Sequence, residues 1–257
     1  MPELPDLEVF AGNLQKRFKN KTIETVEVTV AKKLNVSEAT LKKALEGQKL
    51  EKVSRDGKTL QMHFKNDAVL GLHLMLHGEI RPLDAENLKF PIVSFHFEGG
   101  DGFALTDFQK QATPTLNPEP SEVPDALALT ETYFTNLLQK KKVQIKVLLM
   151  DQKLVRGIGN TYADEILWEA RISPFSVAKA IPHSAVKTLL KAIKHILEKE
   201  SVDIGKKLPV ELHGEIKEFL RIHSPDLEKS PTGKKIIVEK KGARKTYYTE
   251  EQELYTL

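Results

Sequence analysis

Four prolines between Thr113 and Asp125 divide this 257-residue sequence into two parts with different periodicities. Before them, short segments rich in Val, Ile, Phe and Thr are broken by Gly and Asn-Asp, a pattern that predicts antiparallel strands. After them, apolar residues recur at the helical period in four segments: 128–141, 143–155, 160–170 and 184–200. We therefore expect an α+β chain with an extended connector at the prolines.

Shorter elements complete this expected organisation. Residues 3–19 have the pattern of a helix, and a second helix is expected over 37–47, with Ser37 as N-cap and Gly47 as its stop. Residues 233–251 alternate like a β-hairpin with its turn near Lys241-Gly242. The predicted boundaries are 1–116 for a β domain, 117–125 for the linker, 126–223 for a helical domain and 224–257 for the hairpin.

Composition restricts the class of protein. Hydrophobic residues make up 40% and charged residues 29%, which is typical of a globular chain. The absence of cysteine excludes disulfides and thiolate metal sites and favours a reducing compartment. The acidic N-terminus is unlike a signal peptide, and no apolar run has membrane-spanning length. We expect a cytoplasmic protein, associated with the nucleoid if it binds DNA, and the net charge of +3 is only weakly suggestive of such a polyanion.

The N-terminal stretch "MPELPDLEVF" has two interpretations. Proline in a first turn, followed by the acids Glu3, Asp6 and Glu8, is typical of a helix start. Alternatively, removal of Met1 would leave Pro2 as a secondary amine beside carboxylates, an arrangement suited to covalent catalysis. Helix caps are far commoner, but the decapeptide alone leaves both interpretations open.

The most specific local pattern is "KLVRGIGNTYADEILWEARISP". We expect an apolar helix to end at Gly157 and a second helix to start directly after Gly159, with both glycines at positive φ in a tight reversal. Asn160 is expected to cap the second helix, whose exposed amides would attract an anion. An ordinary helical hairpin would explain the same pattern.

Four pieces of the sequence together resemble the formamidopyrimidine-DNA glycosylase and endonuclease VIII family of base-excision repair enzymes. "MPELPDLE" is similar to the family's M-P-E-L-P-E-V-E, and "RDGKTL" is similar to its R-R-G-K-Y-L loop. "GIGNTYADEILWEARISP" is close to its helix-two-turn-helix motif, and "GARKTYY" resembles the second half of its C-terminal finger. The pieces occur in the family's order. The resemblance implies an N-terminal β-sandwich with a leading helix, a helix-two-turn-helix domain and a β-hairpin finger.

The resemblance also implies a reaction and its catalytic residues. Pro2 would be the nucleophile that attacks C1′ of a damaged nucleotide, and β-elimination would then cut the strand, with δ-elimination left open. Glu3 would be the acid/base, and Asp6 stands where the family has a Glu that is one methylene longer. Lys58 would clamp a phosphate and donate a proton. Arg244 would grip the flanking phosphates and promote the second elimination.

The remaining implied residues contact DNA. Leu76 would be the wedge that fills the gap left by the extruded base, although the residue alone could equally be a buried strand residue. His73 would contact the DNA backbone, and Asn160 would hold one of its phosphates. The implied partner is damaged double-stranded DNA, bound by a monomer, with no membrane and no cofactor.

The sequence departs from the family at two places. In "DFQKQA", Lys110 and Gln111 stand where the family's D-P-R-R-F-G has the Arg and Phe that probe the opposite strand. The finger has no cysteine for zinc, and packing of its apolar residues must replace the metal; the residues concerned are Lys229, Thr232, Thr249 and Gln252 at the metal positions and Ile236, Val238, Tyr247 and Tyr248 for the packing.

Alternative functions remain at this point. A non-catalytic damaged-DNA-binding protein would keep the DNA contacts but would not need a free Pro2 amine. A tautomerase with Pro2 as base would leave the helix-two-turn-helix and hairpin without a purpose. The stretch "VDIGKKLPVELHG" matches the family's purine-covering loop only loosely, so the preferred base is undecided.

Overall fold

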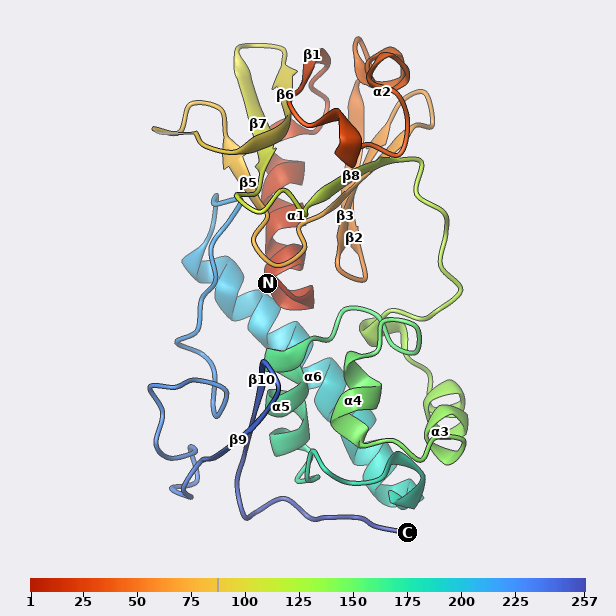
Figure 1. Cartoon of the computed structure of the whole chain (residues 1–257), viewed down its shortest axis with the longest axis vertical. Helices are drawn as coiled ribbons and strands as arrows, with labels where there is room; N and C mark the ends of the chain where they lie inside the picture. Colours follow the sequence, from red (N-terminus) through yellow and green to blue (C-terminus); the bar gives the residue numbers. More distant parts are fainter. Residues whose placement is uncertain (87) are drawn as a thin grey trace. The chain divides into compact units, whose positions relative to one another are not determined.

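The N-terminal strands form two antiparallel sheets in the computed structural model, which describes residues 1–86 and 88–257 (Figure 1). The first sheet has the order β1-β6-β7-β5 and consists of Ile23–Val28, Pro91–Phe97, Asp101–Thr106 and Glu79–Pro82. The second has the order β2-β3-β4-β8 and consists of Leu50–Asp56, Thr59–Phe64, Val69–His73 and Thr113–Leu116. The expected antiparallel β-sandwich is confirmed. Strand β8 pairs with β4 along the sheet edge and ends at Leu116, directly before the predicted linker 117–125.

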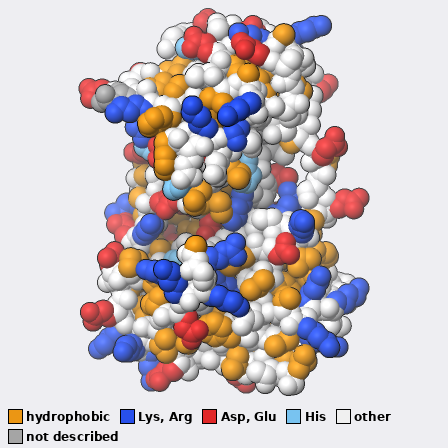
Figure 2. All heavy atoms as spheres, viewed as in Figure 1, with side chains coloured by type: hydrophobic (Ala, Val, Ile, Leu, Met, Phe, Trp, Pro, Cys, Tyr) orange, Lys and Arg blue, Asp and Glu red, His pale blue; other side chains and the backbone are white. Residues whose placement is uncertain are grey.

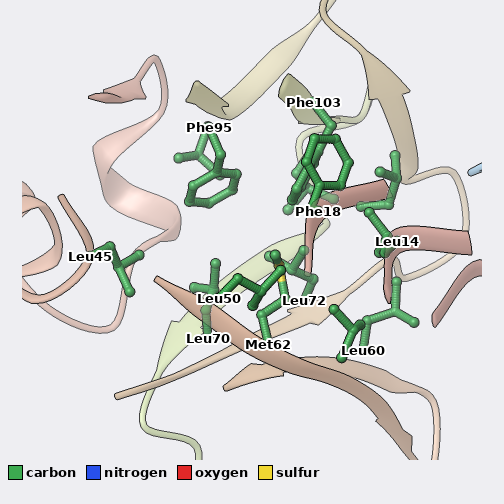
Figure 3. Packing of buried hydrophobic residues seen from close by; sticks show 14 of the residues in the cluster. Leu14, Phe18, Leu45, Leu50, Leu60, Met62, Leu70, Leu72, Phe95 and Phe103 are labelled. Carbon is green, nitrogen blue, oxygen red and sulfur yellow. The ribbon is translucent and has the colours of Figure 1, made fainter. Parts of the chain in front are cut away.

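Alternation along the strands creates the core. In β3, Leu60, Met62 and Phe64 are buried while the intervening residues are partly exposed, as the period of two requires. All three belong to one buried cluster with aromatic residues of the other sheet, and Figure 3 shows Leu60 and Met62 together with Phe95 and Phe103. Phe103 lies 5.2 Å from Phe95 and 5.4 Å from Phe18, measured between ring centroids. Helix α1 (Leu4–Phe18), which carries Phe18, is thereby fixed in the core.

The helices of this part confirm most of the local expectations. Helix α1 begins at Leu4, and the proline in its first turn is Pro5, so Pro2 precedes the helix rather than opening it. Helix α2 spans Glu38–Leu45, and Ser37 caps it by accepting a hydrogen bond from Thr40 N. Gly47 follows with φ +75°, as a helix stop requires.

The remaining helices lie beyond the linker. They are α3 (Glu131–Gln139), α4 (Ile145–Met150), α5 (Asn160–Glu169) and α6 (His183–Lys207), with single 3₁₀ turns at Ala126–Ala128 and Ala178–Ala180. A further 3₁₀ turn, Ala31–Lys33, lies between β1 and α2. The expected helix 143–155 ends earlier, at Met150, because the amides of Leu154 and Val155 both bond to Asp151 O in a turn. Of the two glycines expected at positive φ in the tight reversal, Gly157 has a φ of +103°, whereas Gly159 is extended.

The C-terminal hairpin forms as expected. Strands β9 (Ile237–Lys241) and β10 (Arg244–Tyr248) pair across a two-residue turn in which Gly242 has φ +61°. Ile236 and Tyr247 are buried against Trp168 and Ile222. The prediction that Val238 packs there is wrong: its exposed fraction is 48%, because β10 rather than β9 lies against α5. Tyr248 is half-buried and meets Phe175 edge-on, with 5.2 Å between their centroids.

The chain divides into two compact units. One comprises Met1–Pro120 and Ile204–Glu215, and the other comprises Ser121–Asp203 and Ile216–Leu257. Among the described residues, no helix combines the length and apolar character that crossing a bilayer requires.

Candidate functional site

Two buried carboxyl groups stand at the start of α1. Glu3, only 4% exposed, is the N-cap, and it forms a capping box with Asp6 in which each side chain accepts from the other's backbone amide. Glu3 N lies 2.9 Å from Asp6 Oδ2. Burial raises the pKa of Asp6 to about 7; the Glu3 amide opposes this rise and the Glu3 charge adds to it. A carboxyl that titrates near neutral pH can both give and take a proton.

Pro2 precedes this cap and lines a cavity of about 490 Å³. The cavity wall combines the apolar side chains of Leu74, Leu76, Phe90 and Phe108 with the polar or charged side chains of Glu79, Arg81, Lys89, His213 and Glu215. All of these residues belong to the first unit. A hollow in which apolar side chains are combined with polar groups that can orient a ligand is the usual form of a small-molecule site.

Lys58 and His73 lie beside each other near the ends of neighbouring strands. Lys58 follows Gly57 (φ +58°) in the two-residue turn between β2 and β3, and its side chain is largely buried. His73 pairs with Thr59, the next residue in the chain. Burial and the Lys58 charge lower the pKa of His73, whose Nδ1 accepts a hydrogen bond from Met75 N at 3.1 Å. The unprotonated nitrogen thus orients the loop that follows β4.

That β4–β5 loop presents Leu76 to solvent. Met75 adopts a left-handed conformation (φ +55°), and Leu76 is 52% exposed. The alternative that Leu76 is a buried strand residue is therefore wrong. Nearby, the ring of Phe108 contacts His77 at a tilt of 46°, with centroids 4.7 Å apart, and Phe108 is 57% exposed. Sequence reasoning missed Phe108, whose only signal is an aromatic residue in a polar loop.

Lys110 lies in the β7–β8 loop, which a single carboxylate organises. The Asp107 carboxylate accepts hydrogen bonds from the amides of Gln109, Gln111 and Ala112 at 2.8, 2.8 and 2.9 Å. Lys110 itself is exposed and left-handed, with φ +53°. The loop therefore holds a cation at a defined place on the surface.

In the second unit, Asn160 contacts the hairpin strand that begins with Arg244. Asn160 is the first residue of α5, and the N-cap is Gly159, so the prediction that Asn160 caps the helix is wrong. Its side-chain amide donates instead to Lys245 O at 3.2 Å. Its Oδ1 is buried and lacks a hydrogen-bond partner within residues 1–86 and 88–257. Arg244 is exposed.

A buried ion pair anchors the same strand. Lys146 Nζ lies 2.8 Å from Asp164 Oδ1, and Asp164 Oδ2 accepts from Tyr247 N at 2.9 Å and contacts His223 Nδ1 at 2.7 Å. Lys146 also donates to Lys245 O at 3.1 Å. Sequence reasoning missed this pair; its signal is a charged residue within each of two apolar helical segments. The contacts of Lys146 and Asp164 with the backbone of β10 hold this strand in place. Removing either partner would leave the other charge buried without its counter-ion, which is costly.

Two of the four positions that align with the family's zinc ligands contact a carboxylate. Glu251 Oε2 accepts from Thr232 Oγ1 at 2.8 Å and from Thr249 Oγ1 at 3.1 Å, with Arg171 Nη1 3.4 Å away. Partial burial acts to raise the pKa of Glu251, but these partners hold it below its usual value. The Gln252 side-chain amide instead donates a hydrogen bond to Ile172 O, and the backbone of Lys229 forms an isolated β-bridge with that of Lys235. In the part of the chain that the structure describes, no cluster of three His, Asp or Glu side chains could hold a metal.

Comparison with known proteins identifies the family. Residues 1–113 match the formamidopyrimidine-DNA glycosylase N-terminal domain, and residues 116–209 match the H2TH domain of formamidopyrimidine-DNA glycosylase. The formamidopyrimidine-DNA glycosylase of Lactobacillus gasseri is 33% identical over 214 residues, covering 77% of this chain and 76% of that protein. The Listeria monocytogenes protein of the same name is 34% identical, with 80% of each chain covered. This chain belongs to the formamidopyrimidine-DNA glycosylase family.

Solved structures agree with this membership. A complex between Lactococcus lactis Fpg and DNA containing an abasic site has a TM-score of 0.84 at 27% identity, covering 98% of this chain and all of that one. A structure of MutM with DNA containing carbocyclic 8-oxo-G has a TM-score of 0.86 at 28% identity with the same coverage. The α+β fold of the family is thus shown for this chain.

The sequence-predicted site residues fall into two groups, one in each unit. Pro2, Glu3, Asp6, Lys58, His73, Leu76 and Lys110 lie in the first unit, and Asn160 and Arg244 lie in the second. Within the first, the structure joins Glu3 to Asp6, Lys58 to His73, and Pro2 to Leu76 through the cavity they both line.

Proposed function

We propose that this member of the family is a bifunctional DNA glycosylase and abasic-site lyase that removes oxidised bases from duplex DNA. The observation that carries the proposal is the position of Pro2. It lines the cavity and stands directly before a buried Glu3–Asp6 capping box. An amine, an acid/base and a hollow for a small ligand would then share one place.

The proposed reaction begins after removal of Met1, when the Pro2 nitrogen becomes a secondary amine with a pKa near 8. The neutral amine attacks C1′, the bond from C1′ to the base breaks, and the base leaves with a proton. The resulting iminium makes a C2′ proton acidic. Loss of that proton breaks the C3′–O bond and releases the 3′ phosphate, and water then frees Pro2.

Glu3 and Asp6 supply the proton transfers in this proposal. Glu3 protonates the ring oxygen of the sugar as the ring opens. Asp6 is too short to replace the family's Glu directly, but it reaches the Glu3 amide and so fixes the cap. Its role is therefore to position Glu3 and, as a carboxyl whose pKa is raised to about 7, to give or take a proton near neutral pH.

The DNA contacts are assigned from position and charge. Lys58 contacts the phosphate at the lesion, and His73, which lies beside Lys58, contacts the DNA backbone. Leu76 enters the base stack, which is consistent with its exposure on a left-handed loop. Lys110 faces the opposite strand. In the second unit Asn160 and Arg244 bind phosphate, the guanidinium by a bidentate contact.

Substrate, assembly and location follow the same proposal. Related structures are complexes of MutM with DNA containing carbocyclic 8-oxo-G and of Lactococcus lactis Fpg with DNA containing FAPY-dG. We infer that this chain acts on oxidised bases, as a monomer, in the cytoplasm and at the nucleoid.

Borohydride trapping on a duplex with an abasic site tests the proposal. The wild-type protein, shown by mass to lack Met1, should form a covalent adduct. Pro2→Gly should weaken that adduct, whereas Pro231→Gly, at an exposed proline, should not. DNA binding without an adduct would favour the non-catalytic alternative. A robust adduct from protein that retains Met1 would assign the amine to a lysine.

A further inference from the structure

One buried arginine connects the helix that Glu3 caps with the turn that carries Lys58. The side chain of Arg55, on β2, is only 5% exposed. Its Nε lies 2.8 Å from Glu8 Oε2 on α1, and its Nη1 donates to Gly57 O at 2.9 Å. Helix α1 and strand β2 lie side by side, so the guanidinium joins two neighbouring elements of the first unit (Figure 1).

The turn between β2 and β3 is one whose central peptide can adopt two orientations. Gly57 and Lys58 form its centre, between the paired residues Asp56 and Thr59. Gly57 has φ +58° and Lys58 has negative φ, which is the II′ pattern. The I′ turn, in which both central φ values are positive, differs from it by rotation of the peptide between the two residues. Glycine accepts both forms, so the turn sequence alone does not fix the direction in which the Lys58 side chain leaves the backbone.

The hydrogen bond from Arg55 selects one of these orientations. The bond that closes a two-residue turn uses the carbonyl of the first paired residue, here Asp56, and not that of the glycine. Gly57 O belongs to the central peptide itself, so the bond from Arg55 Nη1 holds this peptide against rotation. The conformation of Lys58 is fixed with it, because rotation of the peptide changes ψ of Gly57 and φ of Lys58 together.

The same guanidinium ties the turn to the helix that follows the proposed nucleophile. Glu8 lies five residues after the Glu3 cap, which is about 7.5 Å along the helix axis. Arginine can donate from Nε and from Nη1 at once because its guanidinium is planar and rigid, whereas lysine has a single nitrogen on a flexible chain. A lysine in place of Arg55 would therefore keep the charge and lose one of the two contacts.

We propose that Arg55 is a positioning residue that sets where the Lys58 ammonium meets a DNA phosphate. It does so by locking the peptide between Gly57 and Lys58 and by holding the turn at a fixed distance from Pro2. The inference rests on the proposed function, in which Lys58 contacts the phosphate at the lesion. Arg55 itself touches neither DNA nor the reacting atoms, because its guanidinium is directed at Glu8 and at the Gly57 carbonyl.

A charge-conserving substitution tests this role. The probe is a duplex that contains the abasic analogue tetrahydrofuran, which cannot form the Pro2 adduct, and its affinity is measured by fluorescence anisotropy over a range of salt concentrations. The slope of log affinity against log salt reports the phosphates that cations neutralise, at about 0.9 each. Arg55→Lys, Lys58→Ala and the double variant are compared with wild type. Arg17→Lys is the matched control, because Arg17 is also an α1 neighbour of a carboxylate, Asp101, at 2.7 Å.

Arg55→Lys should reduce the magnitude of the slope by about 1, although it leaves the net charge unchanged. Lys58→Ala should reduce it equally, and the double variant should show no further reduction, because the same phosphate contact is lost in all three. A structural role alone would lower the free energy of unfolding and leave the slope unchanged. Arg17→Lys should behave in that second way.

Glu8 provides a second route if Arg55→Lys does not fold. Its carboxylate side chain is 49% exposed, so its replacement disturbs the core less than a change at Arg55. Glu8→Ala removes the acceptor of Arg55 Nε and should reduce the slope in the wild-type background but not in the Lys58→Ala background. Glu8→Gln keeps an acceptor and should leave the slope unchanged in both.

The outcomes separate this inference from the proposed function. An unchanged slope in Arg55→Lys, or a reduction that persists undiminished in the Lys58→Ala background, would overturn the inference alone, and the same criteria apply to Glu8→Ala. A wild-type slope in Lys58→Ala would overturn the phosphate contact of Lys58 and this inference with it. Wild-type protein that forms no borohydride-trapped adduct with abasic DNA would overturn the proposed function instead.

Discussion

Asp6 shows how a single residue can serve both folding and chemistry. Its carboxylate completes the capping box at the start of α1. Such a box is a general way to stabilise a helix N-terminus. Burial also brings its pKa to about 7, far above its value of 3.8 in an unfolded chain. The two interpretations of the N-terminal stretch are thus compatible, because a helix cap and an acid/base pair can consist of the same atoms.

The raised pKa makes stability depend on pH in a definite direction. Between pH 4 and 7 the folded chain holds the Asp6 proton and the unfolded chain does not, so the free energy of unfolding must fall as the pH rises. The difference between a pKa of 3.8 and one of about 7 corresponds to a loss of up to about 4 kcal/mol in the free energy of unfolding. Asp6→Asn can still accept from Glu3 N but cannot ionise, and its stability should fall less over this range. Urea denaturation at a series of pH values measures the difference.

Glu200 provides the matched comparison in the other unit. Its pKa is also raised to about 7, by burial first and by neighbouring Glu165 in opposition to Arg221. Glu200→Gln should reduce the same pH dependence independently of Asp6→Asn. Identical pH profiles for wild type and Asp6→Asn would show that Asp6 is not buried in its protonated form.

The loop between β4 and β5 depends on a glycine for close approach. A Cβ at Gly78 would collide with the carbonyl oxygen of Leu74 and lie 2.8 Å from the Ala112 side chain. Gly78→Ala should therefore destabilise the protein by about 1–3 kcal/mol and displace Leu76. Chemical denaturation, with binding to abasic DNA as a second measurement, checks this expectation.

Gly12 is the control at the same substitution. It lies within α1, and a Cβ there would meet nothing within 4 Å. Gly12→Ala should stabilise the protein by about 0.5–1 kcal/mol, since alanine is the better helix former. If Gly78→Ala behaved like Gly12→Ala, the loop would have room to rearrange.

In the C-terminal hairpin, we expect polar contacts to provide the stabilisation that a structural metal would otherwise provide. We expect dialysis against a strong chelator to leave the melting temperature and the excision rate unchanged. Glu251→Ala should cost about 1–3 kcal/mol, because it leaves the Thr232 and Thr249 hydroxyls without their acceptor. Glu250→Ala is the control, since its ion pair with Lys234 is exposed to solvent and should contribute little to stability. Activity lost on chelation and restored by zinc alone would contradict this view.

For the whole molecule, the sequence was informative where a pattern is local. Strand alternation, the Ser37 cap and the Gly242 turn depend on neighbouring residues, and each was predicted correctly. The pairs Lys146–Asp164 and Arg81–His213 could not be predicted, because their partners are 18 and 132 positions apart and only the folded chain joins them. The exposure of Val238 was not predicted, because the alternation of residues along a hairpin does not determine which of its two strands packs against helix α5.

Net charge also says little about where a polyanion binds. The total is only +3, and Figure 2 shows acidic and basic side chains interspersed over the face it presents. DNA affinity must then come from a few placed cations. Each phosphate that such a cation neutralises releases counterions and contributes about 0.9 to the slope of log affinity against log salt.

Arg244 should be one of these cations. We expect the affinity for abasic duplex DNA to fall steeply with salt, and Arg244→Ala to reduce the magnitude of the slope by about 1, equally for every lesion. Lys42→Ala, whose ammonium is paired with Glu38 on α2, is the matched charge control and should leave the slope unchanged. Fluorescence anisotropy from 50 to 300 mM salt gives both slopes. An Arg244→Ala variant with an unchanged slope but an altered preference among lesions would show that the hairpin contacts bases rather than phosphates, because only a phosphate contact releases counterions without regard to sequence.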